Sequence, residues 1–235
     1  MCRAAREFEI EDGRFLNKHE KRYPLEKVAI IGAGDFAREI LTCIKDILYS
    51  SKKIHDRIIF VEPDDGFTER NIHDFKVIPQ SLFDPSVWSA VVSVSNPEKR
   101  EKIVGHLPHN THFATVVHPS AVISEWVNIK DGSVVTAGSI LTCDITVGMH
   151  SQLNLHTTIG HDTICGDYFT TAPAANISGA CKIGNRVYFG TNSSIRQGVT
   201  VCDDVTVGMG SVVIKDISEP GIYVGSPSQK LVKHN

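Results

Sequence analysis

Large apolar residues recur at every sixth position through the second half of the chain. Of the sixteen positions spaced six apart from Ile123 to Val213, only Cys165 and Thr171 are not large and apolar, and both are small. A period of six fits neither an α-helix, with about 3.6 residues per turn, nor a strand that alternates at every second residue. It predicts a chain that turns a corner every six residues, with the periodic side chain inward and a following glycine permitting the corner.

Three such hexads close one triangular coil of about 18 residues, which is the hexapeptide form of a parallel β-helix. We expect this β-helix over residues 118–235, including a cap at its C-terminal end, because each coil buries its floor only against the next coil. The repeat keeps its frame throughout, so no long loop is expected to interrupt it.

A different pattern opens the chain after residues 1–26, a polar extension of mixed charge to which we assign no function. Residues 28–31 predict a short buried strand, and a G-x-G-x-x-A motif leads into an apolar helical pattern. In this context Gly32 makes the tight turn, Gly34 lets a ligand approach the backbone, and Ala37 lets the helix pack near the strand. The free N–H groups at the helix N-terminus then favour an anion.

Further strands at residues 58–61 and 90–94 complete a small βαβαβ unit over residues 27–117. The carboxylate of Glu62, directly after the second strand, suits a ribose or another sugar hydroxyl. The unit is half of a full dinucleotide-binding fold, which favours one nucleotide over NAD. A tight turn that binds no ligand is the alternative.

Composition narrows the partners. The chain has 235 residues, 41% hydrophobic and 22% charged, with a formal net charge of −3, which disfavours nucleic acid. No apolar stretch approaches the ~20 residues of a membrane span, and we expect no secretory signal. The six cysteines form no CxxC pair. We therefore expect reduced thiols in the cytoplasm, with neither a disulfide framework nor a thiolate zinc site.

The two halves together resemble one family over about residues 27–232. The matching segments are the glycine turn IGAGDFAREI, the third-strand segment SNPEKR, the joining segment VVHPSAVIS, the coil segment from Asn154 to His161-Asp162, and the closing segment GIYVGSP. In this combination the chain resembles the hexapeptide-repeat sugar acetyltransferases, which include bacterial nucleotide-amino-sugar N-acetyltransferases and sialic acid O-acetyltransferases. The resemblance implies a Rossmann-like α/β domain followed by a left-handed parallel β-helix, assembled as a homotrimer with active sites between subunits.

The same resemblance implies the residues of the catalytic and donor sites. His161, with Asp162 beside it, would be the catalytic base, and acetyl-CoA would lie along the backbone at Gly179, Thr191 and Met209. No metal is expected.

The resemblance also implies an acceptor site and one departure. The nucleotide sugar would be held by Gly34, Asp35, Phe36, Glu62 or Asp64, and Asn96. Many relatives carry a second histidine nine residues after the catalytic one, in contact with the cofactor. Here that position is Thr170, which removes the expected imidazole contact.

Acetyl transfer needs a base for the attacking group and donors for the tetrahedral oxyanion. Histidine suits the first task, and Asp162 can orient His161 if the pair sits at a prism corner, since adjacent residues in a strand point oppositely. One coil beyond His161 stands Gly179, which leaves room for the imidazole and offers an N–H to the oxyanion. No serine shows a nucleophile-elbow context, so we expect direct transfer.

Alternatives for the histidines stay open. His161 is either the base or a structural surface residue. His156 and His161, five residues apart, match the spacing in prism-shaped zinc enzymes of the carbonic anhydrase type, but the third ligand position is Ser120.

The sequence thus predicts an acetyl-CoA-dependent N-acetyltransferase that acetylates the amino group of a nucleotide-linked amino sugar, such as a UDP-, dTDP- or GDP-linked 4-amino-4,6-dideoxy sugar. A sugar O-acetyltransferase of the sialic acid type and a non-catalytic trimeric scaffold that senses a nucleotide are the alternatives. His161-Asp162 argues against the scaffold, and the motifs do not choose between an amine and a hydroxyl acceptor.

Overall fold

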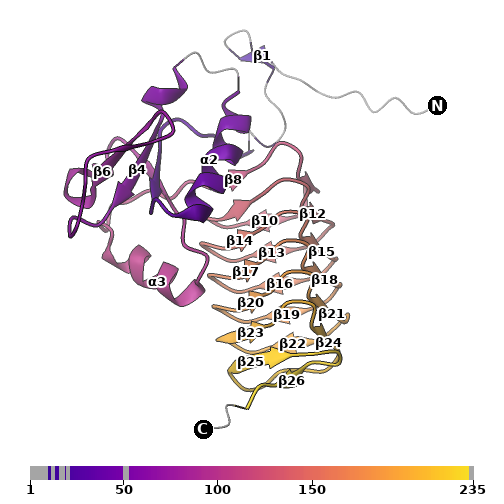
Figure 1. The fold of residues 1–235 in the computed structure, drawn as a ribbon. Helices are drawn as coiled ribbons and strands as arrows, with labels where there is room; N and C mark the ends of the chain where they lie inside the picture. The colour runs from indigo at the N-terminus through magenta and orange to yellow at the C-terminus, as the bar shows by residue number, and fades with distance from the viewer. Residues whose placement is uncertain (1–9, 12–13, 16–18, 20–21, 50–52, 233–235) are drawn as a thin grey trace.

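The computed structural model describes residues 10–11, 14–15, 19, 22–49 and 53–232. It consists of a small α/β domain seated on one side of a long β-helix (Figure 1). The last coils of the β-helix extend beyond the α/β domain, toward the C-terminus. The predicted fold class, an α/β domain followed by a parallel β-helix, is confirmed. In the described ranges, no helix is long and apolar enough to cross a membrane.

The α/β domain is built on a five-stranded sheet with the order β5-β6-β4-β3-β7, in which only β5 runs antiparallel to its neighbour. Its elements are β3 (Val28–Ile31), α2 (Asp35–Ile47), η1 (Ile54–Asp56), β4 (Ile58–Glu62), β5 (Asn71–Ile72), β6 (Phe75–Pro79), η2 (Gln80–Leu82), β7 (Ser89–Val92) and α3 (Pro97–His106). The three predicted strands correspond to β3, β4 and β7, whereas the β5–β6 hairpin has no counterpart in the prediction. Because β4 and β7 flank β3, the connections diverge at its carboxyl end, where ligands bind in open parallel sheets.

The turn after β3 takes the form that the glycine motif predicts. Gly32 has φ +102°, and a Cβ there would lie 2.8 Å from Ser93 Oγ, so conformation and space both require glycine. Ala37 is fully buried, which lets α2 pack close to the sheet. The apolar face of α2 lies between this sheet and the β-helix, where it shares a core with Val116 and Val134.

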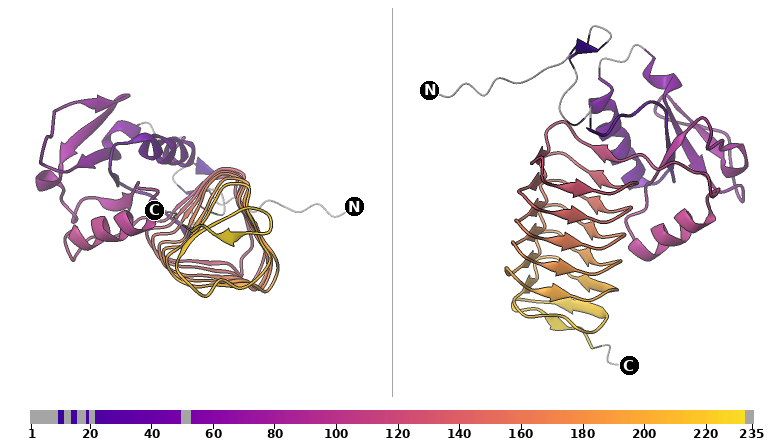
Figure 2. Two further views of the ribbon diagram at one scale, coloured as in Figure 1. Left: turned by 60° about the horizontal axis from the view of Figure 1, so that its bottom comes forward. Right: turned by 180° about the vertical axis from the view of Figure 1, so that it is seen from behind.

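The β-helix has three faces of short strands and a triangular cross-section (Figure 2). The covered face, which packs against the α/β domain, contains β8 (Val116–Val117), β11 (Val134–Val135), β14 (Gln152–Leu153), β17 (Thr170–Thr171), β20 (Tyr188–Phe189), β23 (Val205–Val207), β25 (Gly221–Val224) and β26 (Gln229–Lys230). The six-strand face contains β9 (Val122–Ile123), β12 (Ile140–Leu141), β15 (Thr158–Ile159), β18 (Asn176–Ile177), β21 (Ser194–Ile195) and β24 (Val212–Val213). The five-strand face contains β10 (Asn128–Ile129), β13 (Thr146–Val147), β16 (Ile164–Cys165), β19 (Lys182–Ile183) and β22 (Thr200–Val201).

Each full coil takes three hexads, as the period predicts. Val134 pairs with Gln152, and Gln152 pairs with Thr170, in parallel register. The corners fall three residues after the inward side chain and use the left-handed region of the backbone; Asp162, three residues after Ile159, has φ +59°. The register therefore aligns equivalent side chains of successive coils along each edge of the prism.

The glycines that follow the periodic residue have a different role from the predicted one. Gly148 is not among the residues with positive φ, and a Cβ there would lie 2.3 Å from the carbonyl oxygen of Gly166 on the next coil. The interpretation that these glycines permit the corners is wrong. They let successive coils stack closely, while residues such as His150, two positions later, make the corner.

Both ends of the β-helix core are covered. Strands β25 and β26 pair antiparallel at the C-terminal end. At the other end Tyr23 packs against the core, and the guanidinium of Arg22 donates to the carbonyl oxygen of Val127. Part of the predicted extension, residues 1–26, therefore caps the first coil, and much of that extension lies outside the described residues. A hairpin of β1 (Ile10–Glu11) and β2 (Arg14–Phe15) precedes the cap.

Candidate active site

His161 and Asp162 stand at the corner between β15 and β16, called here the His161 edge. Because Asp162 turns the chain with a positive φ, the two adjacent side chains meet, and His161 Nδ1 lies 2.7 Å from Asp162 Oδ2. The side chains are 51% and 64% exposed. The corner contact that the sequence required of this pair is present.

The carboxylate decides which ring nitrogen of His161 is free. An ionised carboxylate only accepts hydrogen bonds, so Asp162 places the proton on Nδ1 and leaves the lone pair on Nε2. This is the tautomer in which Nε2 can take a proton from an attacking group.

Gly179 lies directly beside that free nitrogen. A Cβ on Gly179 would stand 2.6 Å from His161 Nε2, so only glycine leaves the imidazole its place. Within the part of the chain that the structure describes, the Gly179 N–H makes no hydrogen bond to protein. The spacing of one coil thus brings an unused backbone donor next to the imidazole, as the sequence predicts.

Cys143 occupies the same edge one coil before His161, and the sequence analysis did not single it out. Burial together with the carboxylates of Asp144 and Asp162 raises the pKa of the Cys143 thiol. A protonated thiol is a poor nucleophile, so this cysteine is unsuited to carrying an acyl group. Counting back three hexads from His161 is the signal that could have identified it.

The predicted acceptor residues gather at the carboxyl edge of the α/β sheet. Gly34 precedes α2, and Asn96 precedes α3, each after a strand of that sheet. A Cβ on Gly34 would meet no atom within 4 Å, so the backbone there borders open space. Asn96 is committed to the fold, since its side-chain oxygen accepts from Lys99 N at 2.9 Å and caps α3.

The acidic side chains at this edge also have protein partners. Glu62 Oε2 lies 2.7 Å from Arg70 Nη1. The carboxylate of Asp64 accepts from the hydroxyl and the backbone N–H of Ser81. The third acid in the predicted set is tied within its own helix and is highly exposed: Asp35 pairs with Arg38 at 2.6 Å. Phe36 is half-buried against the domain core.

The predicted donor residues fall on two different edges. Gly179 lies at the His161 edge, whereas Thr191 and Met209 lie at the corner between the covered face and the six-strand face, called here the Met209 edge. The Met209 side chain is 79% exposed. One chain by itself therefore does not bring these three residues to one place.

Thr170, the departure from the family pattern, is buried beneath the α/β domain. Its hydroxyl accepts from Arg100 Nη2 at 2.7 Å, and 2% of the residue is exposed. Arg100 is the last residue of the matching segment SNPEKR, but nothing in the sequence indicates that its side chain reaches the β-helix.

His156 stands at the Met209 edge rather than beside His161. In the described ranges, no three His, Cys, Asp or Glu side chains are grouped so as to hold a metal ion.

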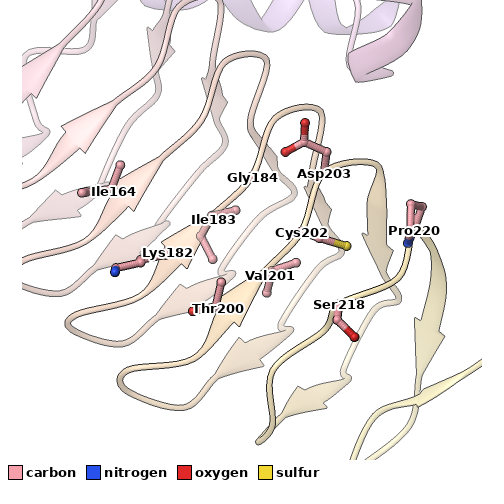
Figure 3. A pocket seen from close by; sticks show the side chains of 10 residues that line it. All are labelled: Ile164, Lys182, Ile183, Gly184, Thr200, Val201, Cys202, Asp203, Ser218 and Pro220. Atoms are coloured by element: carbon pink, nitrogen blue, oxygen red, sulfur yellow. The ribbon is translucent and has the colours of Figure 1, made fainter.

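A hollow of about 490 Å³ opens on the five-strand face (Figure 3). It starts at Ile164, three residues after His161, and runs past Lys182 and Thr200 to Ser218 and Pro220 near the C-terminal end. Its lining is largely apolar along the strands, with one ammonium group at Lys182.

Each half of the chain contains a segment that matches a known protein family. Residues 27–107 match the PglD N-terminal domain, and residues 181–215 match the hexapeptide repeat of succinyl-transferase. A GDP-perosamine N-acetyltransferase from Escherichia coli O157:H7 is 25% identical over 174 residues, covering 72% of this chain and 78% of the relative.

Two solved structures share the arrangement of both halves. The acetyltransferase domain of PglB from Neisseria gonorrhoeae, in complex with acetyl coenzyme A, is 26% identical with a TM-score of 0.79, over 88% of this chain and 100% of that one. A mutant of perosamine N-acetyltransferase from Caulobacter crescentus, in complex with CoA and GDP-perosamine, has a TM-score of 0.79 at 22% identity, over 90% and 99% of the two chains.

The fold and the site together define the class of protein, an acyltransferase built on hexapeptide repeats. Within that class, the chain combines a match to the PglD N-terminal domain with similarity to sugar N-acetyltransferases over both halves. The family resemblance of the sequence is confirmed.

Proposed function

We propose that this chain transfers the acetyl group of acetyl-CoA directly to the amine of a nucleotide-linked amino sugar, with His161 as general base. The observation that carries the proposal is the His161–Asp162 pair, whose free Nε2 lies beside Gly179. The relatives with CoA, acetyl coenzyme A or GDP-perosamine support the choice of donor and acceptor.

The atoms and protons of the reaction balance between the two substrates and these residues. The neutral amine attacks the thioester carbonyl carbon, a C–N bond forms, and the amine proton passes to His161 Nε2. Asp162 stabilises the imidazolium, and the Gly179 N–H donates to the tetrahedral oxyanion. When the intermediate collapses, the C–S bond breaks and the imidazolium returns the proton to the departing CoA thiolate.

The acceptor is proposed to bind at the carboxyl edge of the α/β sheet. The N-terminus of α2 offers free N–H groups to a diphosphate, and Gly34 leaves that approach open. Glu62 or Asp64 is proposed to meet a sugar or ribose hydroxyl. Their pairing with Arg70 and Ser81 holds the two carboxylates in place.

A homotrimer is proposed because the site is divided between two edges. If the six-strand face points toward a three-fold axis, the His161 edge of one copy borders the Met209 edge of the next. Gly179 and the pair Thr191 and Met209 then line one cleft for acetyl-CoA. The six-strand face exposes Val122 and Ile140, at 58% and 43%, which favours its burial against another copy.

The cytoplasm is the proposed compartment. The described cysteines are free thiols, as a reducing environment favours.

A thiol-release assay with acetyl-CoA tests the proposal. The acceptors are UDP-, dTDP- and GDP-linked amino sugars and sialic acid. Each amino-sugar nucleotide is compared with the same nucleotide sugar that carries a hydroxyl in place of the amine. We expect CoA release with an amino-sugar nucleotide and none with its hydroxyl counterpart. Release only with a hydroxyl acceptor contradicts N-acetylation, and no release with any acceptor indicates a non-catalytic scaffold.

A further inference from the structure

Arg100 of α3 is fully buried at the contact between the α/β domain and the β-helix. Among the described residues its guanidinium has no carboxylate partner; every acceptor that it meets is neutral. Burial lowers the pKa of Arg100 to about 9, and it stays a cation at neutral pH. Burying a cation costs free energy unless its N–H groups are hydrogen-bonded. The guanidinium is therefore fixed by its hydrogen bonds as well as by packing.

On the β-helix side, Arg100 contacts one coil from both ends. Nε donates to the carbonyl oxygen of His150 at 2.8 Å, and Nη2 donates to that of Tyr168 at 2.7 Å. Two side chains of the covered face complete the set, Gln152 Oε1 at 3.1 Å from Nη1 and Thr170 Oγ1 at 2.7 Å from Nη2. The planar fork of an arginine satisfies such a fixed set of acceptors, and a lysine does not.

On the α/β side, the same guanidinium holds a loop of the proposed acceptor site. Nη1 donates to the carbonyl oxygens of Val94 and Ser95 at 2.7 and 3.2 Å, directly before Asn96. Ser93 ties this loop to the glycine turn, because its hydroxyl lies 2.8 Å from the carbonyl oxygen of Ile31. Arg100 thus joins the acceptor edge of the sheet to one coil of the β-helix.

The coil that Arg100 contacts is the one that carries the base. His150 and Tyr168 bracket it, and His161 lies between them in the chain. A three-fold axis parallel to the β-helix leaves the height of a coil unchanged. Arg100 therefore lies at the same height along the β-helix as His161 of any copy, whether the base comes from this chain or from a neighbouring one.

We propose that Arg100 is a positioning residue that fixes the acceptor-binding loops at the height of the His161 coil, with the hydroxyl of Thr170 as one of its anchors. This role rests on the proposed function. It also gives a role to Thr170, at the position where the family resemblance implies a histidine: the hydroxyl accepts from the interdomain arginine.

The test compares Michaelis constants in purified, full-length variants. Arg100→Lys keeps the charge and loses the fork, and Thr170→Val removes one acceptor at nearly constant volume. We expect each to raise the acceptor KM by about tenfold or more, because a buried charged donor that loses its acceptor is unfavourable, and the loops shift from their acceptor-binding position to relieve it. The KM for acetyl-CoA should stay within about twofold of wild type in the same assays.

Matched variants separate positioning from general damage. Thr170→Ser keeps the hydroxyl and is expected to return the acceptor KM to the wild-type value. Lys102→Ala, on an exposed turn of the same helix, should change neither constant. If Arg100→Lys does not fold, the comparison of Thr170→Val with Thr170→Ser decides alone.

Two outcomes overturn the positioning role. One is an unchanged acceptor KM in Thr170→Val. The other is an equal loss for both substrates in every folded variant, which indicates damage to the whole fold. A wild-type chain that acetylates no amino-sugar nucleotide overturns the proposed function and, with it, this role. An active wild type whose Thr170→Val variant keeps the wild-type acceptor KM overturns this role alone, so the two failures are distinguishable.

Discussion

The β-helix and the α/β domain hold their functional groups by different physical means. In the β-helix, parallel register aligns the same position of successive coils along one edge, so Cys143, His161 and Gly179 are neighbours through backbone pairing alone. In the α/β domain, loops that follow different strands are held by side-chain contacts, such as Ser93 with Ile31 and Asp64 with Ser81. The proposed catalytic pair therefore stands on a rigid, repetitive scaffold, while the proposed acceptor edge depends on side-chain contacts that single substitutions can loosen.

The largest expected effect is on the β-helix side. His161→Asn should lower kcat by about 10²–10⁴, the usual loss of a general base. The half-exposed ring is not part of the core, so the melting temperature and the KM for acetyl-CoA should match wild type. Asp162→Asn should lower kcat less, because this carboxylate orients the imidazole and does not take the substrate proton. Steady-state kinetics and calorimetry on the three proteins give the comparison.

The assignment of His161 has a clear contradiction. A His161→Asn variant that keeps more than about a third of the wild-type kcat, far above the loss of a general base, shows that another group takes the proton. The His161 edge would then bind substrate without supplying the base.

The same contrast explains what the sequence could predict. A period of six fixes which residues point inward and which stand one coil apart, so the sequence alone places Gly179 beside His161. The role of Gly148 could not be predicted, because it depends on how close the next coil comes. Arg100 and the pairing of Glu62 with Arg70 arise from tertiary packing, which leaves no periodic trace.

The second prediction concerns the pH dependence of stability at the contact between the two regions. His150 is 4% exposed, stacked against Tyr168 and in a T-shaped contact with the ring of Phe113. Burial and the nearby Arg100 cation lower its pKa from 6.5 to about 4. Below pH 6.5 the unfolded chain therefore binds a proton at His150, whereas the folded chain does not bind it until the pH approaches 4. Stability from this residue is complete above pH 6.5 and is lost as the pH falls toward 4.

The size of this loss is at most about 3 kcal/mol, because lowering a pKa by one unit corresponds to roughly 1.4 kcal/mol. Denaturant unfolding of the wild type between pH 7.5 and 4 measures it against His150→Phe, which keeps an aromatic ring and has no titrating group. We expect a flatter pH dependence in the variant. Identical slopes over this range contradict a buried neutral His150.

On the α/β side, two glycines of one turn are expected to respond differently. Gly34→Val should raise the acceptor KM by roughly tenfold or more, since the new side chain enters the open space where a ligand would meet the backbone. The KM for acetyl-CoA and the melting temperature should hold. Gly32→Val is the matched control, and it should lower stability because of its φ of +102° and the contact with Ser93. Equal loss of both substrates in Gly34→Val indicates misfolding and removes Gly34 from the acceptor site.

The smallest expected effect is at Cys143, the other register neighbour of His161. Proximity by register does not make a group catalytic. Burial and the nearby carboxylates raise the pKa of this thiol and so keep it protonated. Cys143→Ala should therefore keep kcat within about twofold of wild type, far from the loss expected when a nucleophile is removed. Mass spectrometry of the wild type after incubation with acetyl-CoA alone should show no acetylated peptide containing residue 143. A collapse of kcat together with such a peptide would mean that the acetyl group passes through the thiol. In that case the β-helix edge supplies a nucleophile as well as a base, and direct transfer is wrong.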